Sequence, residues 1–281
     1  MTAISIEDAQ AILADRNVIA VGARGDDERR RRHGGRTTFV RVFEVHTDAV
    51  PASLPAGVSA GEIRLVGKPP SVAAAIASVK SAHGLAGGVP LTGYSIADLL
   101  ELAGSQASSL SDLAGRLGAA GLMMVSDAPV DLLPDAVEAI RAVRTGGLEV
   151  TRLTVQHAVD DPLRVLGLAR DVQAAVGGVR AFAPLPRVSS VAQPTTGYDD
   201  VRQIAVARLV VHNIESIQVD WALYGPKLAQ VALTMGADDV DSVSALEGDL
   251  GRRRSPIEEI RGNITAAGLD PVERTGSWVP R

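Results

Sequence analysis

The chain has 281 residues, of which 46% are hydrophobic and only 3% aromatic, and its 28 Lys and Arg against 33 Asp and Glu give a net charge of −5. It contains no cysteine. This composition excludes disulfides, thiolate nucleophiles, cysteine-type zinc sites and cysteine-ligated iron–sulfur clusters within this sequence. The length fits one large domain or two small ones.

The charge pattern argues against a dedicated nucleic-acid binder. Such proteins neutralise many phosphates at once, whereas the one dense basic run here is Arg29–Arg32. We interpret this run as a solvated helix face or turn, with a structural pairing role as the alternative. No apolar stretch approaches the ~20 residues that a membrane span needs, and the N-terminus lacks a signal-peptide pattern. We therefore expect a soluble cytoplasmic protein with neither nucleic acid nor membrane as a partner.

Short β-branched runs alternate with segments of helical period, as strands and crossover helices do. The predicted strands are Thr37–Val45, Glu62–Val66, Val89–Thr92, Leu122–Ser126, Glu149–Val155, Arg180–Ala183, Ser216–Val219 and Asp239–Asp241. Eight strands over about 250 residues favour an α/β fold of the closed (β/α)8 TIM type. An open doubly wound sheet is the alternative, because strand order cannot be read from one sequence.

The helix after the fifth predicted strand has clear boundaries. Asp160 and Asp161 precede Pro162, which suits the first turn of a helix, and Gly177 and Gly178 end it. We assign the acidic pair to helix capping and give it no role in ligand binding. No linker divides the chain, so we expect a single barrel domain over residues 37–281, preceded by an N-terminal helix/strand extension over residues 1–36.

Four segments of the last third carry a specific likeness to a known family. They are Ala207–Ile214, Ile217–Gln230, Gly236–Asp239 and Ala267–Arg274. In order and spacing they resemble the menaquinone-pathway (futalosine) radical SAM family, which includes aminofutalosine synthase and dehypoxanthine futalosine cyclase. The likeness is strongest over residues 201–281 and weaker upstream. It implies a TIM-type barrel, in agreement with the strand count.

The resemblance does not extend to the family's cofactor chemistry. Enzymes of this family bind a four-iron cluster through three cysteines of a CxxxCxxC loop after the first strand, and S-adenosylmethionine chelates the fourth iron. Here Pro51, Pro55 and Val58 stand at the cysteine positions. Because such clusters select soft thiolates, we expect no iron–sulfur cluster, no other metal and no working S-adenosylmethionine site.

Two more family positions differ. Gly67 is followed by Lys68, where the family has a second glycine that contacts the amino group of the cofactor. A cation at this position would repel that ammonium group. After the last strand the family has paired glutamates, of which this chain keeps Glu247. We therefore expect that the site has changed its function or lost it.

Polar residues at the ends of the predicted strands would point into the mouth of a barrel. His157, which matches a family histidine, and Asp239 are the predicted catalytic residues. The predicted ligand-binding residues are His46, Lys68, Tyr94, Asp127, Arg187, Trp221 and Glu247. Plain structural roles stay open for four of these residues: a loop histidine for His157, a packing histidine for His46, a turn carboxylate for Asp239 and a core aromatic for Trp221.

Our first functional hypothesis is a cluster-less relative of the family that has no radical chemistry. It would bind a nucleoside-like or carboxylate small molecule, or support a cysteine-bearing paralogue as a partner subunit. Homo- or hetero-oligomers would bury apolar surface such as Leu132–Leu133 or Val210–Val211.

The second hypothesis is a lyase or hydrolase that acts on a futalosine-like intermediate. His157 would serve as acid or base, Lys68 or Arg187 as the carboxylate anchor, and Asp239 as the orienting group. A barrel that retains the scaffold and binds no ligand is a third reading.

Overall fold

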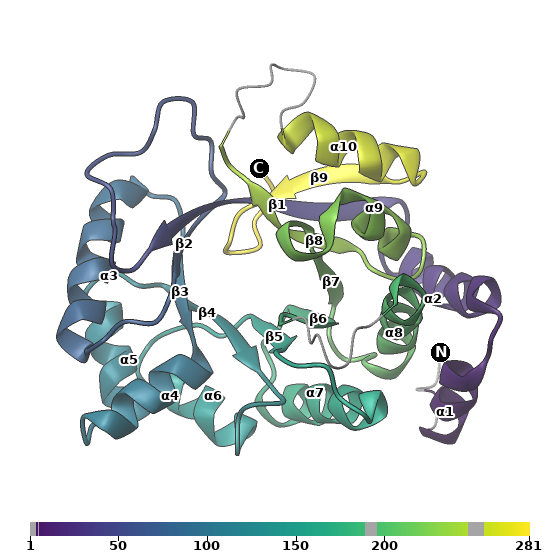
Figure 1. Ribbon diagram of the computed structural model, residues 1–281, viewed down its shortest axis with the longest axis horizontal. Coiled ribbons are helices and arrows are strands. Elements are labelled where there is room, and N and C mark those ends of the chain that lie inside the picture. The colour runs from purple at the N-terminus through teal and green to yellow at the C-terminus, as the bar shows by residue number, and fades with distance from the viewer. Residues whose placement is uncertain (1–3, 5, 189–195, 247–255) are drawn as a thin grey trace.

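The structure is a computed structural model that describes residues 4, 6–188, 196–246 and 256–281. Eight parallel strands follow one another around a closed barrel, because β1 pairs with both β8 and β2 (Figure 1). The strands are β1 (Arg36–His46), β2 (Glu62–Val66), β3 (Leu91–Ser95), β4 (Met124–Pro129), β5 (Arg152–Val155), β6 (Ala181–Pro186), β7 (Ser216–Asp220) and β8 (Asp239–Ser244). The predicted closed barrel is confirmed, and the open sheet is excluded.

Helices surround this barrel (Figure 1). They are α1 (Ile6–Ala14), α2 (Val18–His33), α3 (Val72–Ala86), α4 (Ile96–Ser105), α5 (Leu110–Ala119), α6 (Ala136–Thr145), α7 (Pro162–Val176), α8 (Gly197–Val210), α9 (Trp221–Leu233) and α10 (Pro256–Ala266). The boundaries of α7 are those the sequence predicts: Asp161 caps it by accepting from Arg164 N, and Gly177 follows its last residue. None of the helices in the described part of the chain has both the length and the apolar composition needed to cross a bilayer.

Several strands begin and end later than predicted. The N–H of Val89 donates to Ala86 at the end of α3, and that of Leu122 donates to Leu117 at the end of α5. These two residues therefore complete helix ends instead of starting β3 and β4. At the other end, β8 continues past Asp241 to Ser244. Because β8 extends to Ser244, Asp239 lies at the start of the strand, at the end of the barrel opposite the mouth.

A ninth strand, β9 (Asp270–Arg274), is absent from the prediction. It runs parallel to the first half of β1, Arg36–Val40, whereas the second half, Val42–His46, pairs with β2. Pro271 is tolerated because β9 lies at the edge of the sheet. The strand brings the C-terminal residues under the barrel, at the end opposite the mouth.

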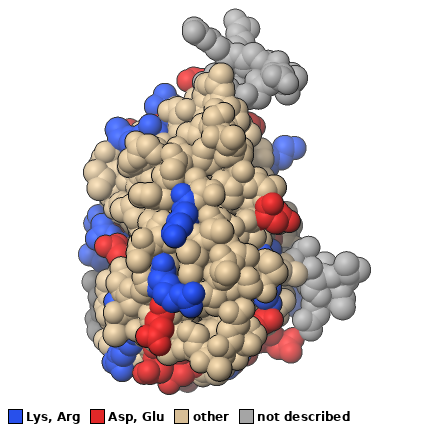
Figure 2. Space-filling model, turned by 90° about the vertical axis from the view of Figure 1, so that its left-hand side faces the viewer, with Lys and Arg blue, Asp and Glu red and all other residues tan. Residues whose placement is uncertain are grey.

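Residues 6–33 form α1 and α2, which lie outside α8 (Figure 1). Gly25 permits the close approach of α2, since a Cβ there would lie 2.3 Å from the carbonyl oxygen of Met235. The interpretation of the arginine run as a solvated face is only partly right. Arg30 and Arg31 are exposed, but Arg29 is fully buried. Figure 2 shows the side of the molecule away from α2, where basic and acidic side chains are interspersed and form no continuous basic surface.

A buried charged cluster joins α2 to α8 and to the start of β8. Arg208 pairs with Asp238 and donates to the carbonyl oxygens of Gly236 and Glu215. The His33 Nε2 atom lies 3.2 Å from the Glu215 carbonyl oxygen and 3.4 Å from Asp238. Burial and the charge of Arg208 lower the pKa of His33 to about 4. His33 is therefore neutral at pH 7 in the folded protein.

This lowered pKa predicts a specific acid sensitivity. Below pH 6.5 His33 is protonated in the unfolded chain, whereas in the folded chain it stays neutral down to about pH 4. Stability should fall across this window, with a slope approaching about 1.4 kcal/mol per pH unit from this one residue. Urea unfolding between pH 7 and 4 should show that His33→Gln flattens the decline. The matched variant at an exposed histidine, His83→Gln, should keep the wild-type slope, and equal slopes in all three proteins would contradict the prediction.

Candidate functional site

Polar side chains line the barrel interior at alternate positions of four strands. They are Glu62 and Arg64 on β2, Arg152 and Thr154 on β5, Gln218 and Asp220 on β7, and Asp239 and Asp241 on β8. Alternate residues of a strand point to the same face, so these side chains converge in the lumen. Each is at least nine-tenths buried. Buried charges require partners, and here the strands supply them to one another.

Asp241 is the centre of this network. Arg64 donates to both carboxylate oxygens, from Nη2 to Oδ1 at 2.9 Å and from Nη1 to Oδ2 at 3.0 Å. Arg152 donates to Oδ2 of the same carboxylate and also, at 2.7 Å, to the Ser126 carbonyl oxygen on β4. One carboxylate of β8 thus holds guanidinium groups from β2 and β5 across the lumen.

The charges of this network change one another's pKa. Burial opposes ionisation of Glu62, but the charge and the 2.7 Å hydrogen bond of Arg64 outweigh it and lower the pKa to about 2. Burial and the charge of Arg64 lower the pKa of Arg152 to about 9. Both groups therefore stay charged at pH 7, and the network is a set of ion pairs.

The lower end of the lumen is closed by the C-terminal segment. Arg274 of β9 donates to both oxygens of Asp239 at 2.7 Å, and the ring of Trp278 stacks on its guanidinium at 3.7 Å. Gln218 also donates to Asp239, at 2.7 Å. The cavity left between these groups has about 20 Å³, which is room for about one water molecule. No ligand fits below Arg64 and Arg152.

A larger cavity, of about 230 Å³, opens above these arginines at the mouth of the barrel. Arg187, directly after β6, lines it with its side chain 24% exposed. Among the described residues its guanidinium has one hydrogen bond, from Nη1 to Asp220 at 3.2 Å. Glu44 of β1 is exposed at the same cavity and accepts no hydrogen bond from the described part of the chain. Within the described part of the chain, the mouth thus holds a cation and an anion whose hydrogen-bonding capacity is not filled.

Asp127 is a second anion in the wall of this mouth cavity. It accepts hydrogen bonds from Ser126 Oγ at 2.6 Å and from Thr154 Oγ1 at 2.7 Å. Burial raises the pKa of Asp127, but the charges of Arg187 and Arg152 outweigh it and the net effect lowers the pKa. Asp127 is therefore ionised, as the pairing of charges in the mouth requires.

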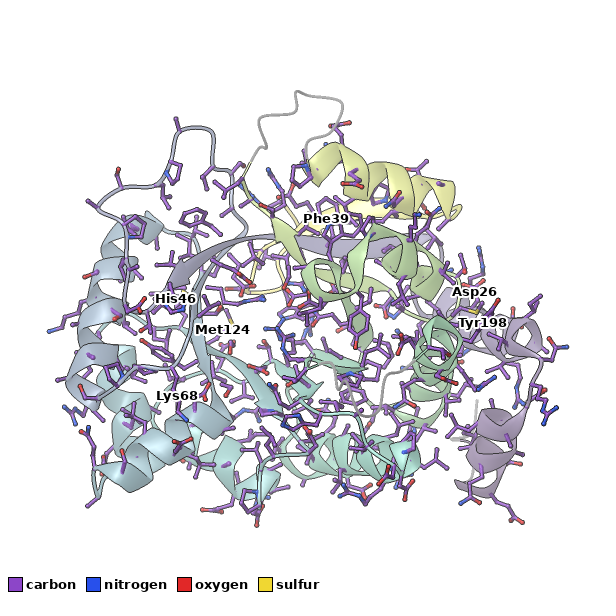
Figure 3. The ribbon with its side chains drawn as sticks, in the orientation of Figure 1. Asp26, Phe39, His46, Lys68, Met124 and Tyr198 are labelled. Atoms are coloured by element: carbon purple, nitrogen blue, oxygen red, sulfur yellow. The ribbon has the colours of Figure 1, made fainter. Side chains whose placement is uncertain are left out.

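Three other predicted ligand-binding residues lie near this cavity but are engaged elsewhere. His46 pairs with Asp48 and is largely exposed, and Lys68 forms an exposed ion pair with Glu101 of α4. Figure 3 labels His46 and Lys68 on the side of the barrel where α3 and α4 lie. Tyr94 lies in the cavity wall, but its hydroxyl group points away from the mouth. It bonds Thr47 Oγ1 at 2.8 Å and the Ala75 carbonyl oxygen of α3.

The two predicted catalytic residues are not brought together. Asp239 starts β8 and is fully buried against Arg274 at the closed end of the lumen. His157 is exposed and lines a different cavity, outside the barrel mouth. The pairing of His157 with Asp239 is therefore wrong, because β8 is longer than predicted and Asp239 lies at its first residue.

The remaining predicted residues either pack in the fold or lie outside the described residues. Trp221 begins α9 and packs, half-buried, against the apolar core. Glu247 lies outside the described residues. Of the apolar pairs expected at an interface, Leu132 is 42% exposed and Leu133 is buried. Both members of Val210–Val211 are buried in the core, so this pair offers no surface to a partner.

The loop that would carry the family's cluster is described in full. It joins β1 to β2 over residues 47–61, and the resemblance leads one to expect its cysteines where this chain has Pro51, Pro55 and Val58. No side chain of these three residues can ligate iron. Within the described residues there is also no group of three or more His, Asp or Glu side chains arranged to hold a metal ion. The donor set of this chain does not fit a four-iron cluster.

The sequence prediction missed Arg64, Arg152 and Arg274, which carry the buried network. Their signal is a charged residue at alternate positions of a strand, as in Glu62 and Arg64. In a barrel filled by apolar side chains these inward positions would be branched aliphatic residues. Two charged residues separated by one apolar residue therefore mark a polar lumen.

Comparison with known proteins finds one matching family model and several similar proteins. Residues 179–281 match the family model described as the CofH/MqnC C-terminal region. A 5-amino-6-(D-ribitylamino)uracil--L-tyrosine 4-hydroxyphenyl transferase of Methanosarcina barkeri is 28% identical over 50% of this chain and 43% of its own length. Cyclic dehypoxanthine futalosine synthase of Streptomyces coelicolor is 29% identical over 60% of this chain and 49% of its own length.

Aminodeoxyfutalosine synthase of Thermus thermophilus is 38% identical over 42% of this chain and 36% of its own length. The chain thus spans about half, or less, of the length of these relatives. Among solved structures, methylornithine synthase (PylB) aligns with a TM-score of 0.66 at 14% identity, covering 96% of this chain and 94% of that protein. The hydrogenase maturase HydG from Carboxydothermus hydrogenoformans aligns with a TM-score of 0.67 at 10% identity, covering 96% of this chain and 76% of that protein. These structures share the barrel fold.

The network around Asp241 predicts a large stability effect from a small chemical change. Asp241→Asn keeps the shape of the side chain but leaves Arg64 and Arg152 facing each other without the anion between them. Removal of one member of a buried ion pair costs about 3–5 kcal/mol, and urea unfolding should show a loss of this size. The control Glu101→Gln, which breaks the exposed pair with Lys68, should unfold as the wild type does. A loss at Asp241 no larger than that of the control would refute the network's role.

Proposed function

We propose that this chain, a homologue of the CofH and futalosine-pathway radical SAM enzymes, binds a small carboxylate at the mouth of its barrel without performing radical chemistry. The observation that carries the proposal is the Arg187 guanidinium, which lines the mouth cavity with one hydrogen bond to Asp220. A guanidinium group has five N–H donors in a planar fork that matches a carboxylate. Among the described residues, only one of those donors is used.

The groups around Arg187 favour a carboxylate that also carries hydrogen-bond donors. The guanidinium groups of Arg64 and Arg152, both paired with Asp241, form the floor of the cavity, and Glu44 and Asp127 lie in its wall. An anion alone would meet two carboxylates there, whereas an amino or hydroxyl group would donate to them. We therefore infer an amino acid or hydroxy acid. The name of the Methanosarcina barkeri relative includes L-tyrosine, which belongs to this chemical class.

The size of the mouth cavity agrees with a ligand of this kind. Its volume of about 230 Å³ lies below the usual 300–1,000 Å³ of ligand pockets. The ion pairs of Asp241 prevent a ligand from passing deeper into the lumen. With no thiolate in the sequence to hold a four-iron cluster, binding in the mouth is the function that these residues support.

The geometry does not favour the lyase or hydrolase hypothesis. His157 lines a cavity outside the mouth, Asp239 is fully buried, and Lys68 is paired with Glu101. A general base must lie within hydrogen-bond reach of the proton that it removes. The residues assigned to acid, base and anchor lie at separate places, so they cannot act on one substrate.

A partner subunit over the mouth is a second candidate function, which one surface feature supports. Large apolar side chains are exposed at the strand ends and helix starts on the mouth side of the barrel. They are Leu132, Val188, Tyr198, Leu223 and Leu246. Exposed apolar side chains that gather on one side of a protein mark interaction surfaces. We infer that a cysteine-bearing paralogue would cover this side.

Ligand binding is tested with the two arginines at opposite ends of β6. Arg187→Ala should weaken binding of L-tyrosine by about tenfold or more, as expected when a charged hydrogen-bond donor is lost. Arg180→Ala removes an exposed arginine just before β6 and should leave binding unchanged. Titration calorimetry measures both. Equal affinities of the two variants, or no binding by the wild type, would contradict the proposal.

The partner hypothesis is tested by native mass spectrometry after co-expression with a cysteine-bearing paralogue. A complex of two chains should form with the wild type and be lost with the paired substitution Leu132→Asp and Leu223→Asp. The control Val279→Asp changes an exposed apolar residue of the C-terminal segment and should keep the complex. The absence of a complex with the wild type would exclude this candidate while leaving the ligand proposal intact.

A further inference from the structure

The backbone of Arg187, the residue on which the proposed function rests, is fixed by two hydrogen bonds. The N–H of Arg187 donates to the Val155 carbonyl oxygen at 3.0 Å, which continues the pairing of β5 with β6. The hydroxyl group of Tyr224 on α9 donates to the carbonyl oxygen of the preceding residue, Pro186, at 2.5 Å. Arg187 therefore enters the wall of the mouth cavity at a fixed place, and its side-chain torsions remain to be set.

Asp220 is the residue that restrains this side chain. It is the last residue of β7 and only 5% exposed, and its Oδ2 atom accepts from Arg187 Nη1 at 3.2 Å. An arginine side chain has many rotamers, and a ligand that must order them loses affinity. The ion pair with Asp220 restricts the rotamers before a ligand arrives.

The carboxylate of Asp220 is itself held by two other elements. Its Oδ1 atom accepts from Leu223 N at 3.0 Å and so caps α9. Its Oδ2 atom also accepts from the hydroxyl group of Ser242 on β8, at 3.0 Å. Ser242 Oγ in turn accepts from Arg64 Nη1 at 3.1 Å. The group that restrains Arg187 is thus tied both to a helix cap and to the buried network of the lumen.

The backbone of Ser242 has an unusual conformation that makes its contact possible. Its φ is 58°, in the left-handed region that residues with a Cβ rarely adopt. Neighbouring residues of a regular strand point to opposite faces, yet Asp241 and Ser242 both accept hydrogen bonds from Arg64 in the lumen. The change occurs where the register of β8 against β1 shifts. Strain of this kind persists where the surrounding contacts offset it, as they do at functional sites.

The ion pair with Asp220 decides which donors of Arg187 face a ligand. A guanidinium group offers a carboxylate two edges with paired donors, Nη1 with Nη2 and Nε with Nη2. Asp220 engages Nη1, and no other described residue accepts from Nε or Nη2. We propose that Asp220 is a positioning residue, which orients Arg187 so that the edge of Nε and Nη2 binds the ligand carboxylate, and that Ser242 holds Asp220 in place. This inference rests on the proposed function, because it specifies how the same arginine binds.

Asp220→Asn tests the positioning role with little change of shape. The amide oxygen keeps the cap of α9, since Asn and Asp are similar N-caps, and the amide nitrogen can donate to Ser242 Oγ. Toward Arg187, however, the variant presents a donor in place of an acceptor. Titration calorimetry should show L-tyrosine binding about fivefold more weakly than to the wild type. A nearby negative charge without a positioning role would have the opposite effect, because its removal strengthens binding of an anion. Unchanged or stronger binding would therefore overturn the proposal.

Three further variants separate positioning from stability. In an Arg187→Ala background, Asp220→Asn should cause no further loss of affinity, because its effect passes through the arginine, whereas losses that add would overturn the proposal. Ser242→Gly removes the hydroxyl group but suits the left-handed backbone. It should weaken L-tyrosine binding by less than Asp220→Asn does, and unchanged binding would refute the role of Ser242. The control Asp135→Asn makes the same change at the N-cap of α6 and should bind as the wild type does.

A measurement without ligand separates this inference from the proposed function. Phenylglyoxal modifies arginine side chains, and peptide mass spectrometry gives the rate at each one. Asp220→Asn should release the Arg187 guanidinium and raise its rate of modification severalfold relative to Arg180, an exposed arginine before β6. An unchanged rate would refute the positioning role. If the wild type does not bind L-tyrosine, the proposed function fails, and the rate of modification still decides whether Asp220 restrains Arg187.

Discussion

The sharing of the Asp241 carboxylate by Arg64 and Arg152 is the constraint on which the interior of this protein depends. Charged groups taken out of water are stable only where each has a partner in good geometry. β2, β5 and β8 each supply one of the three charges, so the pairing fixes these strands relative to one another. It also divides the lumen, since the space below holds about one water molecule and the usable space lies above.

The fold and the polar groups of this barrel depend on different parts of the sequence. The strands and the helix caps depend on local sequence and on packing, and residues 179–281 match the CofH/MqnC C-terminal region. The loop after β1, where the resemblance leads one to expect three cysteines, has Pro51, Pro55 and Val58. Fold and site are thus carried by different residues, and one can change while the other remains. The mouth retains charged groups such as Arg187 and Asp127, which suit recognition of a polar molecule.

The fold was predictable from the sequence because its signals are local. Asp161, Pro162 and Gly177 mark a helix by capping and by backbone conformation, and the structure has the helix between them. The placement of side chains in the lumen depends on strand register, which a single sequence does not contain. Asp239 was therefore assigned to the wrong end of the barrel. β9 was missed because its start, Asp270 and Pro271, is typical of a turn.

The wall formed by the ends of β5 and β6 has a consequence for the energetics of the protein. One backbone ladder carries Gln156 and Arg187 toward the mouth cavity and His157 and Pro186 toward the separate cavity that His157 lines. A molecule that shifted this ladder from one side would change the geometry on the other side. Thermodynamic linkage would make that influence reciprocal.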